Sequence, residues 1–195
     1  RLAVREALIE LARETLSGDS TANRVAVVEF NSTARILCMP TNMLNRVIGC
    51  LGRVGAAGGS RPDLGLHEGL RAVLRGRGDV KERGHPREAV MLVTDGQNNG
   101  GAARTRDAAR ELQSQGMVVT TVCIAVECRG PVLTGVATTT DEAYEVALSG
   151  VPEVLQDYRV RRLELDPWPS TLWLTGTLPP QLNGLDFQAV SGSGT

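Results

Sequence analysis

Two patterns of apolar residues alternate along the first 163 residues of the chain. Residues 1–15 have apolar positions at the spacing of an amphipathic helix, and the Ser-Gly-Asp-Ser stretch that follows predicts its end. Arg24–Phe30 is then a nearly continuous apolar run of β-branched and small residues, which is typical of a strand covered on both faces. The chain is therefore expected to begin with a helix and a buried strand.

The alternation continues towards the carboxyl terminus. Further strands are expected at 34–39, 89–94, 117–126 and 144–146, and further helices at 44–51, 64–74, 105–115 and 151–163. The strand at 34–39 should form an antiparallel hairpin with the strand before it and end at Pro40.

This order predicts a Rossmann-like α/β fold, because strands that alternate with helices form βαβ crossovers. We expect a three-layer, doubly wound, mainly parallel sheet with one antiparallel edge strand and helices on both faces. Residues 1–163 would form this core and residues 164–195 a carboxyl-terminal extension. In such sheets ligands bind beyond the carboxyl ends of the strands, where the loops at Ser60 and Asp95 should lie.

Composition excludes several classes of function. A formal net charge of −1 and a pI near 6.2 leave no basic footprint for nucleic acid. Apolar runs such as 117–126 are about half as long as the roughly 20 residues of a membrane-spanning helix, so no membrane span is expected. The chain opens on a charged helix and shows no signal peptide, which leaves extracellular and cytoplasmic locations open.

The four cysteines lack the spacing of a zinc site. Cys38 and Cys123 lie within apolar, strand-like runs, where cysteine behaves as a small hydrophobic residue. The cysteines are therefore expected to be buried free thiols.

Three segments carry a resemblance to a known family. These are Val-Ala-Val-Val-Glu-Phe at 25–30, Gly58-Gly59-Ser60 leading into the helix at Leu64, and the strand that ends in Thr94-Asp95-Gly96. In this order they resemble consecutive blocks of a von Willebrand factor A domain, with a likeness that covers about residues 1–163. The resemblance implies a binding module for cell adhesion and no enzymatic activity.

In that family three loops build a metal-ion-dependent adhesion site, abbreviated MIDAS. The resemblance implies that Ser60 supplies the hydroxyl of the second loop and that Asp95 acts in the outer coordination shell. The expected ion is Mg²⁺, or Mn²⁺ or Ca²⁺, and its open position would take an acidic side chain of a protein partner. Taken alone, Asp95-Gly96 is better explained as an ordinary turn after a strand, and only its position within the wider pattern favours the metal site. Asp63 would either approach the site or cap the helix that begins near Leu64.

The family's first strand, with its Asp-x-Ser-x-Ser loop, has no counterpart before residue 1. Its central position must be filled, because the two flanking strands would otherwise bury unpaired N–H and C=O groups at about 1–3 kcal/mol each. Residues 185–195 resemble that strand and loop, with Ser191 and Ser193 as further metal ligands. A circularly permuted domain and a truncated domain with a linker remnant both remain open.

Within 185–195, Ala189 stands where the family has its metal-anchoring aspartate. Loss of that carboxylate should weaken cation binding sharply. A structural or assembly domain with a degenerate, metal-free site is therefore the alternative function. No phosphate-binding loop, nucleophile elbow or activated nucleophile is present, so no catalytic residue and no organic cofactor site is expected.

Three smaller features remain. Asn31-Ser32-Thr33 matches a glycosylation sequon, although its position in a tight turn between strands favours a simple turn role. Arg77-Gly78-Asp79 is the tripeptide that integrins bind, in a predicted loop. Residues 164–184 do not match the family, and Leu172–Thr175 within them is either an extra strand or a connection back to the sheet centre.

Overall fold

The structure is a computed structural model of the whole chain. It describes residues 2–17, 23–55, 59–77, 87–124, 135–138, 143–146 and 170–176. These residues contain helices and strands in alternation, followed by one further strand near the carboxyl terminus. Among them, none of the helices combines the length and the apolar character needed to cross a bilayer.

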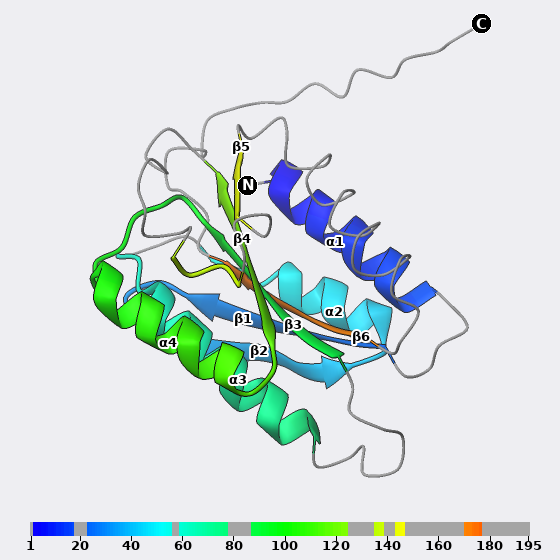
Figure 1. Cartoon of the computed structure of the whole chain (residues 1–195). Coiled ribbons are helices and arrows are strands. Elements are labelled where there is room, and N and C mark those ends of the chain that lie inside the picture. The colour runs from blue at the N-terminus through cyan, green and yellow to red at the C-terminus, as the bar shows by residue number, and fades with distance from the viewer. Residues whose placement is uncertain are drawn as a thin grey trace, which may run out of the picture.

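A six-stranded sheet with the order β2-β1-β6-β3-β4-β5 forms the centre of the molecule (Figure 1). Its strands are β1 (Arg24–Phe30), β2 (Ala34–Thr41), β3 (Arg87–Thr94), β4 (Val118–Ile124), β5 (Ala143–Val146) and β6 (Ser170–Gly176). The edge strand β2 is antiparallel to β1, whereas every other neighbouring pair is parallel. The predicted mainly parallel sheet with one antiparallel edge strand is confirmed.

Helices cover both faces of the sheet, as predicted (Figure 1). Helices α1 (Leu2–Ser17) and α2 (Leu44–Leu51) pack on one face, where Leu8, Leu11 and Val47 meet alternate residues of the strands. Helices α3 (Pro62–Arg77) and α4 (Ala102–Ser114) pack on the other, through residues such as Leu66 and Leu112. The parallel strands β1, β3 and β4 bury apolar residues on both sides because each side faces a helical layer.

The central position between β1 and β3 is occupied by β6. It is aligned with β1 from Arg24↔Thr171 to Glu29↔Gly176, and with β3 from Arg87↔Ser170 to Val93↔Gly176. The strand suggested at Leu172–Thr175 is thus the one that satisfies the backbone groups of both neighbours. The family resemblance suggested residues 185–195 for this central position, and these residues lie outside the described ones. The helix expected at 151–163 also lies outside them.

Most element boundaries differ from the prediction by one to three residues, and two of the differences have a structural cause. β2 continues through Pro40 to Thr41, because an edge strand has one side without a hydrogen-bonded neighbour and tolerates a residue that lacks an N–H. Helix α3 extends to Arg77, whose guanidinium donates hydrogen bonds to both carboxylate oxygens of Glu88 on β3 and to the carbonyl of Gln115. This first residue of the Arg-Gly-Asp tripeptide is therefore engaged within the fold.

The expectation of free thiols is wrong. Cys38 on β2 and Cys50 on α2 form a disulfide with their Cα atoms 5.9 Å apart, and Cys123 is also disulfide-bonded. The error arose because residue spacing does not reveal that α2 packs back against β2, which places two cysteines 12 positions apart within bonding distance. A short covalent loop now holds the edge strand to its covering helix.

Replacing this disulfide by the pair Cys38→Ala and Cys50→Ala should lower the free energy of unfolding by about 2–3 kcal/mol, because the unfolded chain regains the entropy of the closed loop. The slope of the unfolding free energy against denaturant concentration should also rise, since the unlinked chain exposes more surface. Guanidinium titration followed by circular dichroism measures both quantities. An unchanged midpoint and slope would show that the cross-link carries no stability.

Candidate metal site

Ser60 and Asp95 both lie at the carboxyl edge of the sheet. Asp95 directly follows the last residue of β3, and Ser60 lies just before α3, in the loop that leads from α2 back over the sheet. Both residues are buried, with 2% and 5% of their surface exposed. The fold therefore directs two polar residues inward at the edge where parallel sheets bind ligands.

Asn99 connects the loop of Ser60 to the loop of Asp95. The backbone N–H of Ser60 donates a hydrogen bond of 2.6 Å to Oδ1 of Asn99, and the backbone N–H of Asn99 donates one of 2.7 Å to the carbonyl of Ser60. A Cβ atom at Gly59 would lie 2.9 Å from Oδ1 of Asn99, so the close approach of the two loops requires glycine there. Two of the predicted loops of the site are thereby held together.

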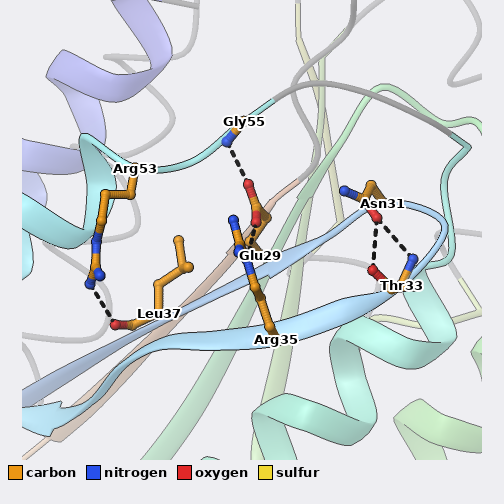
Figure 2. Close-up of polar contacts among 7 residues, drawn as sticks. All are labelled: Glu29, Asn31, Thr33, Arg35, Leu37, Arg53 and Gly55. Atoms are coloured by element: carbon orange, nitrogen blue, oxygen red, sulfur yellow. Dashed lines mark hydrogen bonds and ion pairs between the residues drawn. The ribbon is translucent and has the colours of Figure 1, made fainter.

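The other end of the Ser60 loop is held by Glu29, at the carboxyl end of β1. Its buried carboxylate accepts a hydrogen bond from the backbone N–H of Gly55 and is paired with Arg35 at 2.7 Å (Figure 2). The segment 55–60 is thus anchored at Gly55 by β1 and at Ser60 by the loop after β3. Sequence reasoning missed Glu29 and Asn99, because their partners are 26 and 39 positions away along the chain.

The hydroxyl of Ser60 is buried and has no hydrogen-bond partner within the described part of the chain. Leaving such a group unsatisfied costs about 1–3 kcal/mol. A hydroxyl oxygen in this position is a suitable ligand for a hard cation such as Mg²⁺ or Mn²⁺. The side chain is thus unpaired at the place where the family resemblance puts a metal ligand.

Asp95 takes part in a turn as well. Its Oδ1 accepts a hydrogen bond of 3.1 Å from the backbone N–H of Gln97, and the next residue, Gly96, has a φ of 87°, which favours glycine. The ordinary turn is therefore present. It uses one oxygen of the carboxylate in a hydrogen bond that also fixes the direction of the side chain.

Asp63 lies in the first turn of α3 and is paired with Arg61. The guanidinium donates bonds of 2.9 Å and 2.7 Å to the two carboxylate oxygens, and this hydrogen bonding lowers the pKa of Asp63 against the opposing effect of burial. A Cβ atom at Gly100 would lie 2.4 Å from Oδ1 of Asp63, so the loop after β3 closes tightly over the pair. The negative charge of Asp63 is therefore already balanced by the guanidinium of Arg61.

No group of three or more His, Cys, Asp or Glu side chains with metal-binding geometry occurs in the described ranges. Among the described residues, the carboxylates on the segments that lead from Ser60 and from β3 are Asp63, which is paired with Arg61, and Asp95, which accepts a hydrogen bond from Gln97. Ala189, Ser191 and Ser193 lie outside the described residues. The described donors, one hydroxyl and one carboxylate, fit an ion that keeps several waters and is weakly bound.

A family model of the von Willebrand factor type A domain matches residues 2–156, which is most of the chain. The chain belongs to the von Willebrand factor A family. Such domains are in general interaction modules that bind other proteins. No curated protein matches the chain.

Solved structures share the fold at low sequence identity. Proximal thread matrix protein 1 from the mussel byssus is 16% identical over 80% of this chain, with a TM-score of 0.65, and the chain covers 41% of that protein. A second structure of the mussel protein, with zinc in its MIDAS motif, is 18% identical over 78% of this chain and 39% of that one, with a TM-score of 0.60. Manganese-loaded TRAP protein of Plasmodium vivax is 15% identical, covers 80% and 64%, and has a TM-score of 0.60.

Removing the Asn99 side chain should loosen the Ser60 loop of this von Willebrand factor A domain. We expect Asn99→Ala to lower the free energy of unfolding by about 1 kcal/mol, because the N–H of Ser60 loses its acceptor. Asn99→Asp retains an oxygen acceptor and should recover most of that loss. Urea unfolding compares these variants with Gln97→Ala, an exposed position in the same loop. Equal loss in Asn99→Asp and Asn99→Ala would contradict the proposed role of Oδ1.

The Arg61–Asp63 pair should make stability depend on pH in the acid range. Because folding lowers the pKa of Asp63 below its usual 3.8, the stabilisation is fully present above that value and is lost as the pH falls through the folded pKa. Asp63→Asn should therefore be less stable than wild type at pH 7, with a difference that shrinks below pH 4. Urea midpoints between pH 2.5 and pH 7 test this, with the exposed Asp107→Asn as control.

Proposed function

We propose that this domain is a non-enzymatic protein-binding module that holds an acidic group of its partner through a divalent cation at Ser60 and Asp95. The observation that carries the proposal is the buried hydroxyl of Ser60, which has no hydrogen-bond partner among the described residues, in a loop hydrogen-bonded to the loop of Asp95. Such an unsatisfied group calls for an explanation, and an ion that completes it is one that fits the position of Ser60. The location at the carboxyl edge of a parallel sheet supports the same function.

The ion that best suits these donors is Mg²⁺ or Mn²⁺, with Ca²⁺ as a further candidate, because all prefer oxygen ligands. Bound there, the cation supplies a positive charge and an open coordination position for the carboxylate of the partner. Ser60 would donate a hydroxyl oxygen, and the carboxylate of Asp95 would offset the charge of the ion. Glu29 and Asn99 position the Ser60 loop from its two ends.

Ser191 and Ser193 are proposed as the remaining hydroxyl ligands. The chain leaves β6 at Gly176, at the carboxyl edge of the sheet, so the segment that carries these serines starts from the edge where the site lies. With Ala189 in place of an aspartate, they would add oxygen donors without charge. We therefore expect millimolar rather than micromolar affinity for the cation.

Two relatives of known structure carry a metal, zinc in the MIDAS motif of the mussel protein and manganese in TRAP protein. This supports a divalent cation as the ligand type. An enzymatic role is not supported by the sequence, which contains no phosphate loop, no nucleophile elbow and no activated nucleophile.

The second candidate is a structural or assembly domain with a metal-free site. The Arg61–Asp63 ion pair favours it, because the guanidinium engages a carboxylate at the second loop that would otherwise attract a cation. In this case the domain would bind its partner without a metal, and partner retention would be unaffected by EDTA.

Ser60→Ala distinguishes the two candidates. Without metal the variant should be up to about 1 kcal/mol more stable than wild type, because an unsatisfied buried hydroxyl is removed. Its affinity for Mn²⁺, measured by the relaxation enhancement of water protons, should fall by about tenfold or more, which corresponds to about 1.4 kcal/mol.

Thr121→Val is the matched control, since Thr121 is also buried with an unpartnered hydroxyl but lies on β4. It should gain similar stability and bind Mn²⁺ like wild type. If wild type shows no Mn²⁺ binding at millimolar concentration, or if Ser60→Ala binds equally well, the metal-dependent function is excluded and the metal-free candidate stands.

A further inference from the structure

The turn between β1 and β2 is formed by residues 31–33. The backbone N–H and the hydroxyl of Thr33 donate hydrogen bonds of 2.8 Å and 3.2 Å to Oδ1 of Asn31, and the N–H of Asn31 donates one of 2.7 Å to the carbonyl of Thr33. The oxygen of the Asn31 side chain thus closes the turn, as an Asx turn does.

The nitrogen of the same side chain has no such role. Nδ2 of Asn31 has no hydrogen-bond partner in the part of the chain that the structure describes, and Figure 2 shows it on the side of the amide away from Thr33. Ser32 and Thr33 are exposed, and Asn31 is partly so. Asn31-Ser32-Thr33 is the one Asn-x-Ser/Thr sequence in the chain, and Nδ2 is the atom to which N-linked sugars are attached.

Disulfides provide an independent observation about the environment of this turn. Cys38 on β2 is bonded to Cys50, and Cys123 is disulfide-bonded as well. Structural disulfides form and persist in oxidising compartments such as the lumen of the secretory pathway, and are rare in the cytosol. Asparagine-linked glycosylation takes place in that same lumen. A sequon in a cytosolic protein is not glycosylated. In a protein that forms disulfides in the secretory lumen, the sequon is accessible to the oligosaccharide-transferring enzyme.

We propose that Asn31 is an N-glycosylation site. In the transfer, Nδ2 of Asn31 forms a bond to the anomeric carbon of an oligosaccharide carried on a polyprenyl diphosphate. The bond from that carbon to the diphosphate oxygen breaks, the diphosphate leaves with the electron pair, and Nδ2 loses one proton. The folded turn is compatible with the product, because its hydrogen bonds use Oδ1 and none of them, within the described residues, uses Nδ2.

The glycan would lie on the edge of the sheet that carries the candidate metal site. Glu29 of β1 and Val93 of β3 are both aligned with Gly176 of β6. Asn31 and Asp95 each come two residues later, so they lie at the same level of the sheet edge. With β6 between β1 and β3, they are separated by two strand spacings, about 10 Å. If the proposed function holds, we expect a partner to approach this edge from the side of β3 and β4, away from the sugar.

The test is expression of the full chain in animal cells behind a cleavable secretion leader, with analysis of protein from both medium and lysate. Digestion with peptide N-glycosidase in ¹⁸O water should increase gel mobility and convert Asn31 to aspartate with one ¹⁸O, as measured by peptide mass spectrometry. Asn31→Gln and Thr33→Ala should migrate like the digested wild type.

Thr33→Ser and Ser32→Ala keep the sequon and are the matched controls, which should remain glycosylated. An unmodified Asn31 in every fraction, while a co-expressed glycoprotein carries its sugars, would overturn the proposal. So would a mobility shift that persists in Asn31→Gln. Mn²⁺ binding plays no part in this readout, so its result is separate from that of the proposed function.

Discussion

The insertion of β6 between β1 and β3 is the interaction on which the rest of the structure depends. A parallel sheet assembled from β1, β3, β4 and β5 without it would bury two unpaired ladders at its centre, at about 1–3 kcal/mol for each orphan group. β6 satisfies both ladders and brings the ends of β1 and β3 to a common edge. Glu29 and Asp95 lie at the same edge of the sheet because that central strand aligns β1 with β3.

The candidate site combines strong positioning with little charge. The Ser60 loop is held at Gly55 by Glu29 and at Ser60 by Asn99, so its hydroxyl is fixed without a partner of its own. Asp63, the other carboxylate at this loop, is neutralised by Arg61. A fixed hydroxyl favours a cation at this loop, whereas the ion pair at Asp63 reduces the attraction for one, which is why weak metal binding and metal-free binding are the two competing functions.

The β1–β2 hairpin carries both the disulfide to α2 and the turn that contains the glycosylation sequon. A disulfide connects β2 to α2, and the turn at 31–33 is closed through Oδ1 of Asn31 at the sheet edge that carries the candidate site. Both features concern the edge strand, which has one neighbour in the sheet and gains least from backbone pairing. A covalent link at this strand offsets that weakness, because it restricts the unfolded chain.

Hydrophobic periodicity was sufficient to predict the α/β class, the elements from α1 to β5, the antiparallel edge and the position of Asp95 after a buried strand, since these depend on neighbouring residues and on burial of apolar faces. It could not predict that 170–176 forms the central strand, that Cys38 reaches Cys50, or that Asn99 binds the backbone of Ser60. Each of these pairs residues distant along the chain. Local sequence determines which segments form strands and helices. The pairing of strands across the sheet and of one loop with another is determined only when the whole core packs, because every buried backbone group then needs a hydrogen-bond partner.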